Sequence, residues 1–270
     1  MTARWLAVPF GSLLILAAVS SRPVSAQTNQ DPAPSAAPAA TQAPGDNLSL
    51  EETARLYLVR KQFHEAEEIF RQLTREQPRN AVYWNELGIS LHNQAQLNQA
   101  MKCYEKSTKL DGKYADALNN MGTVWYERKK YGKAIRSYRK AIALRGDFAP
   151  FYLNLGYAYF SKVEYEDSIA SFRKALAIDP NVFDSSRSRM GTVVQDRSLN
   201  GDRGRFYFLL AKSFAESGNV ERCFIYLKKA RDEGYADFNA AKSDPSFAAA
   251  MKDPAVQELF VTKQGEAAQP

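Results

Sequence analysis

A unit of similar residues recurs in this chain every 34 positions. In residues 115–148, the small residues Gly122 and Ala134 alternate with large apolar ones such as Trp125 and Tyr138. The same kinds of residue stand 34 positions earlier and 34 positions later. A fixed period of this length predicts a helical solenoid, because each unit buries its apolar face only by stacking on its neighbours.

Each unit divides into two helices of about 12 residues, since apolar spacings of three and four are interrupted by a short polar or Gly-containing break. In the first unit we expect these helices over 48–59 and 63–75. A fifth unit resumes after an interruption. The repeats are predicted at 47–80, 81–114, 115–148, 149–182 and, for the fifth unit, 204–237.

The small positions predict where the two helices of a unit cross. A bulky side chain there would separate the backbones, so Gly or Ala is expected at the crossing. A large residue at Gly122 would overpack this contact and cost about 1–3 kcal/mol.

The first 26 residues have the features of a signal peptide. Arg4 precedes an apolar run over 5–19, and Val24-Ser25-Ala26 offers a small-x-small cleavage site. Cleavage after Ala26 would give an exported protein, periplasmic or secreted. Retention of the segment as a membrane anchor is the alternative.

Two stretches lack the repeat pattern. Residues 27–46 are rich in Pro and Ala, which predicts a disordered linker. Residues 183–203 form an insertion between repeats and include a short β-prone piece over 192–195. We consider two interpretations of this insertion, a surface loop and a functional lid.

The chain closes with a predicted C-terminal cap over 238–262 and a frayed tail over 263–270. Asp244-Pro245 and Asp253-Pro254 each combine an N-cap residue with proline at the first helical position. We therefore expect short helices over 245–251 and 254–262 that cover the last apolar face.

The two cysteines, Cys103 and Cys223, fall in different repeats and are expected far apart. A disulfide needs Cα atoms within about 7 Å. Cys223 also takes a place that is Ala or Ser in most other units, so we expect two free thiols, with Cys223 as a small core residue.

Charge and histidine content argue against several classes of function. The formal net charge of +6 is spread along helix surfaces and includes no basic arm, so nucleic-acid binding is not expected. The only histidines are His64 and His92. Residues 64–68 contain the His-Glu pair of a zinc protease helix but lack its second histidine. We expect no enzyme activity, metal, cofactor or small-molecule substrate.

The repeat resembles the tetratricopeptide repeat family, which is built of 34-residue helix pairs. The resemblance is carried by WNELGISL in the second unit, NNMGTVWY in the third and LNLGYAYF in the fourth. It implies an all-α, right-handed solenoid with C-terminal capping helices, whose first helices line a concave groove. It also implies binding of a protein or an extended peptide in that groove.

Two known groove chemistries of this family match poorly. The asparagine ladder that holds peptide backbone has counterparts only in Asn120 and Asn154, because Glu52, Glu86 and Leu209 take the other places. The clamp for a C-terminal carboxylate matches poorly too. Its places in the first two repeats hold Glu51, Arg55, Asn85 and Ile89.

The first-helix residues left over from the predicted core are the candidate partner-binding residues. They are Asn85, Ile89, His92, Asn119, Asn120, Thr123, Tyr126, Leu153, Asn154, Tyr157, Phe160, Phe208 and Lys212. Aromatic rings supply contact area and asparagines pair with backbone amides, which suits a peptide. The alternative is that the 183–203 insertion or another subunit covers this face.

The leading hypothesis is a non-catalytic interaction scaffold or adaptor in the cell envelope. The alternative is a self-associating structural component of an envelope assembly or secretion complex, in which homo-oligomers form. A remote alternative is an enzyme with its site in the insertion. Contact with a membrane is expected only if the signal segment is retained.

Overall fold

The computed structural model describes residues 48–183 and 202–261, and these residues form helices, turns and no strand. The predicted signal peptide, the 27–46 linker, the β-prone piece of the insertion and the frayed tail lie outside the described residues. The predicted all-α class and the solenoid of helix pairs are confirmed.

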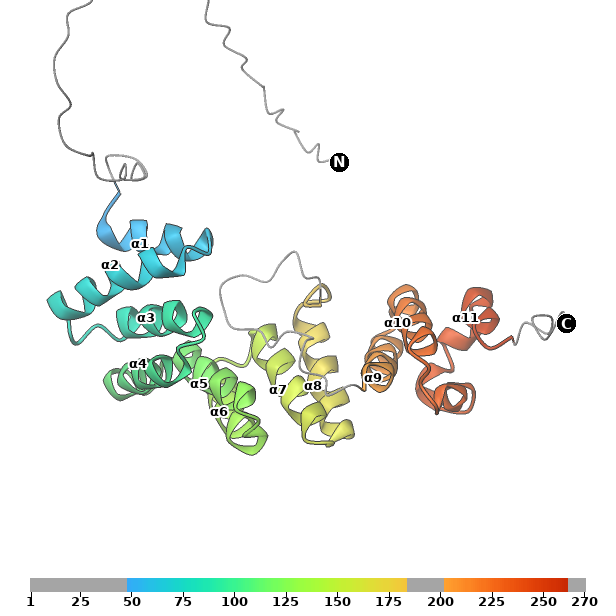
Figure 1. Cartoon of the computed structure of the whole chain (residues 1–270). Helices are drawn as coiled ribbons and strands as arrows, with labels where there is room; N and C mark the ends of the chain where they lie inside the picture. Colours follow the sequence, from blue (N-terminus) through green and yellow to red (C-terminus); the bar gives the residue numbers. More distant parts are fainter. Residues whose placement is uncertain (1–47, 184–201, 262–270) are drawn as a thin grey trace, which may run out of the picture. The chain divides into compact units, whose positions relative to one another are not determined.

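Ten α-helices form five pairs, one for each predicted repeat, and successive pairs follow one another along the stack (Figure 1). In the first unit, the first helix begins two residues later than expected and the second helix ends one residue later. The pairs are α1 Leu50–Val59 and α2 Phe63–Glu76; α3 Ala81–Asn93 and α4 Leu97–Leu110; α5 Ala115–Glu127 and α6 Tyr131–Leu144; α7 Ala149–Ser161 and α8 Tyr165–Ile178; α9 Arg203–Glu216 and α10 Val220–Asp232.

The first helix starts at a complete capping box. The Ser49 hydroxyl accepts a hydrogen bond from the backbone N–H of Glu52, and the Glu52 carboxylate accepts one from the backbone N–H of Ser49 at 2.9 Å. These two bonds satisfy backbone donors that a helix start otherwise leaves unpaired. The Ser49 hydroxyl also donates to the Glu52 carboxylate at 2.8 Å. This bond and the stronger effect of the Ser49 backbone N–H hold the pKa of the Glu52 carboxyl below its usual value.

The two helices of each pair are joined by the same turn. In the five repeats, the residue at the fifteenth position has a positive φ: 60° at Lys61, 59° at Ala95, 57° at Lys129, 69° at Val163 and 75° at Gly218. This left-handed residue reverses the chain between the helices. Only the fifth repeat uses glycine, the residue that adopts this conformation without steric cost.

Within the three central repeats, a glycine lies directly against an aromatic ring. A Cβ atom on Gly88, Gly122 or Gly156 would lie 2.3–2.5 Å from the ring of Tyr104, Tyr138 or Phe172. The predicted close crossing is confirmed at each of them. The ring fills the space that glycine leaves, and all three rings are fully buried.

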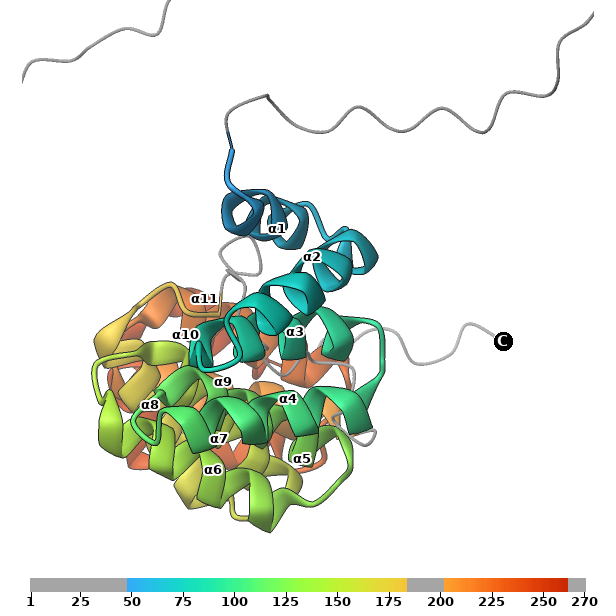
Figure 2. The same ribbon diagram turned by 90° about the vertical axis from the view of Figure 1, so that its left-hand side faces the viewer.

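Neighbouring repeats pack in the same way along the stack, including across the insertion. The first helices α3 and α5 touch each other, and so do α5 and α7. Each second helix packs on the next first helix, as α2 does on α3 (Figure 2). Across the insertion, α8 packs on α9, and Phe206 of α9 stacks 5.4 Å from the ring of Tyr157. The insertion therefore leaves the stacking of the fifth repeat intact.

The C-terminal cap differs from the prediction. In place of a helix over 245–251, the chain forms short 3-10 helices at Pro245–Phe247 and Ala250–Lys252, and the last helix ends at Glu258. Asp253 is extended, the conformation favoured before proline, and it separates the last 3-10 helix from the last α-helix, as the predicted boundary between 251 and 254 requires. A further 3-10 helix, Phe238–Lys242, was not predicted.

Both cysteines are free and buried, as expected. Cys223 is fully buried in α10, and burial raises the pKa of its thiol to about 12. Its place in the core corresponds to Ala66, Ala100, Ala134 and Ser168 in the other repeats.

Candidate functional site

The predicted partner-binding residues lie along the first helices, and almost all of them are buried. The exception is Lys212, whose side chain is 19% exposed and pairs with Asp244 at 2.9 Å. The buried ones are Asn85, Ile89, His92, Asn119, Asn120, Thr123, Tyr126, Leu153, Asn154, Tyr157, Phe160 and Phe208. Their role in binding stays a prediction, but they are not an open surface of exposed side chains.

Four asparagines connect three successive first helices. Asn120 of α5 donates from Nδ2 to Oδ1 of Asn85 in α3 at 2.9 Å, and Asn154 of α7 donates in the same way to Asn119 of α5 at 2.9 Å. Within α5, Asn119 donates to Asn120 at 3.3 Å. The four buried amides thus form one continuous series from the second repeat to the fourth.

The series is extended at one end by a tyrosine. Asn85 Nδ2 donates to the hydroxyl of Tyr114 at 3.4 Å. A buried amide without a hydrogen-bond partner costs free energy. Each of these repeats therefore depends on its neighbour to supply partners for its buried asparagines.

A second pair of contacts follows the same geometry two helical turns further along. His92 Nε2 lies 2.8 Å from Glu127 Oε1, and the hydroxyls of Tyr126 and Ser161 lie 2.7 Å apart. Both contacts join a residue of one first helix to a residue of the next. His92 Nδ1 also lies 3.4 Å from the hydroxyl of Tyr104, so both nitrogens of this buried ring have a partner.

All four inter-repeat contacts span 35 residues, whereas the sequence repeats every 34. Neighbouring first helices are therefore offset by one residue where they touch. Sequence comparison at a spacing of 34 aligns Asn120 with Asn154 and does not reveal that each one bonds an asparagine at the preceding position of the previous repeat. A search at a spacing of 35 would have found both pairs.

The aromatic residues of the predicted site belong to the stacking of the fourth and fifth repeats. Phe160 packs edge-on to Phe206 at 5.3 Å and lies 5.6 Å from the ring of Tyr165. Tyr157 packs against the rings of Phe172 and Phe206. These rings hold α7, α8 and α9 together.

The C-terminal cap covers the fifth repeat's part of the site. The Asp244 carboxylate forms an ion pair with the ammonium group of Lys212, and the ring of Phe247 lies 5.4 Å from the ring of Phe208. Glu216 accepts a hydrogen bond from Ser246 at 2.9 Å. A partner of this chain would find this end of the face already filled by residues 244–247.

At the opposite end, the first helices carry carboxylates. Glu51 of α1 accepts a hydrogen bond from the Tyr83 hydroxyl at 2.6 Å and pairs with Arg55 at 2.8 Å. Glu86 of α3 is partly buried, and this desolvation raises its pKa to about 7, although the charge of Arg55 acts in the opposite direction. Asp116 and Glu51 raise it further. Glu86 takes the place that asparagine holds in the next two repeats.

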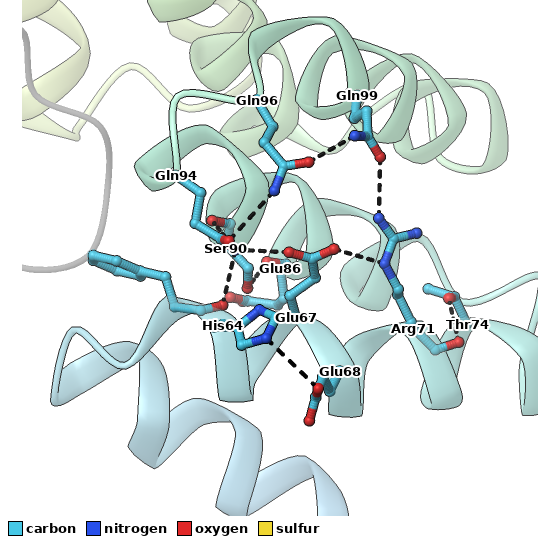
Figure 3. A network of polar contacts seen from close by, with 11 residues as sticks. His64, Glu67, Glu68, Arg71, Thr74, Glu86, Ser90, Gln94, Gln96 and Gln99 are labelled. Carbon is cyan, nitrogen blue, oxygen red and sulfur yellow. Dashed lines mark hydrogen bonds and ion pairs between the residues drawn. The ribbon is translucent and has the colours of Figure 1, made fainter.

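A closed ring of polar side chains joins the first two repeats (Figure 3). Glu67 of α2 accepts hydrogen bonds from Arg71 Nε and Gln94 Nε2, both at 2.7 Å. Gln94 accepts from Gln96, Gln96 from Gln99, and Gln99 from Arg71 at 3.0 Å, which closes the ring. Glu67 is buried, and all its partners lie in α2 or in the turn into α4.

Neither a metal-binding group of side chains nor a membrane-spanning helix occurs in the part of the chain that the structure describes. Over 48–183 and 202–261, no group of three His, Cys, Asp or Glu side chains is arranged to hold a metal ion. Within the same ranges, no helix is long and apolar enough to cross a bilayer.

Comparison with known families agrees with this geometry. Models of the tetratricopeptide repeat match residues 81–114 and 149–182, and a model described as a TPR repeat matches residues 122–163. The chain is a tetratricopeptide repeat protein. The matches coincide with the second repeat and the fourth and extend over the greater part of the third. No curated protein sequence matches the chain.

Several solved tetratricopeptide repeat structures are similar to this protein. A crystal structure of MamA is 21% identical, covers 70% of this chain and 96% of its own, and has a TM-score of 0.47. YrrB, described as a TPR protein with an unusual peptide-binding site, is 14% identical over 72% and 91%, with a TM-score of 0.46. The first repeat domain of Spaghetti (RPAP3), bound to an HSP90 peptide, is 24% identical over 38% and 82%, at 0.38. At these scores the likeness carries no argument about function.

Proposed function

We propose that this tetratricopeptide repeat protein is an exported, non-catalytic scaffold that binds a protein or an extended peptide along its first helices. The observation that carries the proposal is the continuous series of Asn85, Asn120, Asn119 and Asn154 across three repeats. Asparagine amides both donate and accept, as peptide backbone does. A peptide laid along the first helices would exchange bonds with amides that already stand in register with the repeat.

Binding at this face is predicted to loosen contacts between repeats. A peptide that takes bonds from Asn119 or Asn154 competes with the 2.9 Å bond between them. We expect a partner whose own backbone replaces this bond.

Crosslinking in the native cell envelope, followed by binding assays with the purified partner, tests the proposal. The Asn154→Ala/Tyr157→Ala variant should lose the partner that the native chain binds. The matched control is Glu166→Ala/Lys174→Ala, two exposed residues of α8 in the same repeat. Both variants are first checked for native helicity and melting. Equal binding by all three proteins would rule out this face.

A second candidate function is favoured by the burial of the predicted face. Twelve of its residues are buried within the chain itself. A self-associating structural component needs no open groove, since it uses other surfaces. Light scattering over a range of protein concentrations distinguishes the two: a mass that stays monomeric excludes self-association.

Export is part of the proposal and rests on Arg4, the apolar run over 5–19 and the Val24-Ser25-Ala26 site. Amino-terminal sequencing of protein from fractionated cells should give Gln27 as the first residue, outside the cytoplasm. A cytoplasmic chain that begins at Met1 would contradict it.

A further inference from the structure

The positive charge of this protein is concentrated on the second helices of two consecutive repeats. Helix α6 carries Lys133, Arg136, Arg139 and Lys140 and no carboxylate. Helix α4 carries Lys102, Lys106 and Lys109 and one carboxylate, Glu105, which is partly buried. All seven of these cations are exposed. The positive charge lies on helix surfaces, as expected, and within them it is denser on α4 and α6.

The cations follow the repeat. Lys102 and Arg136 occupy the same place in successive repeats, and so do Lys106 and Lys140. Residues three or four positions apart lie on the same side of a helix. Lys102 and Lys106 therefore lie on one side of α4, and Arg136 and Lys140 on one side of α6. The first repeat has Glu68 and Gln72 in these places. We call the seven side chains the basic face.

Most of the basic face makes no ion pair within the described part of the protein. Lys102, Lys106, Lys109, Arg136, Arg139 and Lys140 take part in no ion pair with another described residue. Lys133 lies over the ring of Trp125 at 4.3 Å. Like charges placed side by side repel each other, so such a face is stabilised by an anionic surface outside the chain.

We propose that the basic face docks on an anionic phospholipid membrane surface. Specific protein interfaces are built around buried apolar or aromatic anchors, and the basic face consists of exposed, flexible and mainly lysine side chains. A charged bilayer requires no such anchor, because each lysine or arginine near an anionic surface adds to the electrostatic attraction. Leu144 continues the stripe of Arg136 and Lys140 and is 44% exposed, which suits the headgroup boundary.

The choice of lipid over nucleic acid as the anionic partner rests on the proposed function, in which the protein is exported from the cytoplasm. The measurement of binding does not depend on that export. A failure of vesicle binding would therefore leave the first-helix scaffold proposal untouched, and the reverse also holds.

Vesicle co-sedimentation of the full chain tests the proposal. We compare neutral phosphatidylcholine vesicles with vesicles that also contain phosphatidylglycerol. Any binding by the apolar run over 5–19 is common to both vesicle types, so the difference between them reports charge. We expect at least tenfold tighter binding to the anionic vesicles, weakened by added salt.

Two quadruple variants of equal net charge give the control. Lys102→Gln/Lys106→Gln/Arg136→Gln/Lys140→Gln removes the centre of the basic face, and glutamine keeps helix propensity. Arg60→Gln/Arg75→Gln/Arg79→Gln/Lys228→Gln removes four exposed cations elsewhere. The first variant should lose the preference for anionic vesicles at least tenfold, and the second should keep it.

Three results would overturn the inference. The first is equal binding of the native chain to both vesicle types, and the second is an equal loss of binding in the two variants. The third is binding to duplex DNA that depends on the basic face, when binding to vesicles does not. Circular dichroism confirms that both variants retain native helicity.

Discussion

Gly122 lies directly beneath the ring of Tyr138, so that a Cβ atom on the glycine would stand 2.5 Å from Cε1 of the tyrosine. Real Cβ contacts are never this short. The two helices of the third repeat can approach this closely only because the residue has no side chain. The tyrosine ring is fully buried.

Gly122→Ala is therefore predicted to destabilise the protein by about 1–3 kcal/mol, because overpacking displaces the Tyr138 ring or separates the helices. Denaturant unfolding measures this change. The matched control is Gly132→Ala in α6 of the same repeat, where a Cβ atom meets nothing within 4 Å. That substitution should stabilise by up to about 1 kcal/mol, since alanine is the better helix former. Equal changes in the free energy of unfolding at both positions would contradict the close approach of the two helices at Gly122.

The 34-residue repeat pattern predicted this crossing, whereas it did not predict the polar contacts between repeats. Gly122 and Tyr138 belong to the same unit, and their chemistry recurs with the period of the repeat. Asn85 and Asn120 belong to different units and differ by one position in register. That offset is a property of how two helices pack, and the amino-acid pattern of a single unit does not contain it.

The burial of the predicted site was missed for a related reason. Residues not required for packing within a repeat were interpreted as available to a partner. In the structure they serve packing between repeats, as Tyr157 does against Phe206, or they meet the cap, as Lys212 does with Asp244.

A second prediction concerns the turn between α7 and α8. Val163 has φ 69° and is 65% exposed. A β-branched residue in this conformation is strained, and little burial would be lost on its removal. Val163→Gly should stabilise by about 1 kcal/mol in spite of the extra entropy of the unfolded chain.

The equivalent residue of the fifth repeat gives the opposite test. Gly218 has φ 75° and open space around it, so Gly218→Ala introduces strain without a clash. It should destabilise by about 1 kcal/mol. Thermal melts of both variants measure the pair, and changes of the same sign would show that backbone strain is not the cause.

A third prediction concerns the polar ring at the first repeat boundary. Glu67→Ala leaves Gln94 and Arg71 without the carboxylate that both of them bond (Figure 3). We expect a loss of about 1–3 kcal/mol in the free energy of unfolding. Glu68→Ala, at the next residue, removes a carboxylate that is 72% exposed and lies 3.7 Å from His64. It should change stability by less than about 0.5 kcal/mol.

The last prediction concerns pH and Glu86. Burial raises the pKa of this carboxyl to about 7, above its usual value of 4.5, and the nearby Arg55 only partly opposes the shift. The folded state therefore holds a proton that the unfolded state has released between these two pH values. The stability contributed by this proton is fully present below pH 4.5, falls as pH rises and is lost above about pH 7. Above that value the folded chain contains a poorly solvated carboxylate.

Glu86→Gln removes that charge while keeping the shape of the side chain. The variant should match the native chain near pH 4 and exceed its stability by about 1–3 kcal/mol near pH 8. The other ionisable groups are common to both proteins, so their contributions largely cancel in the difference. Denaturant unfolding at pH 4, 6 and 8 measures it, with Glu68→Gln as an exposed control. A Glu86→Gln difference that is independent of pH would show that this carboxyl titrates alike in the folded and unfolded chains.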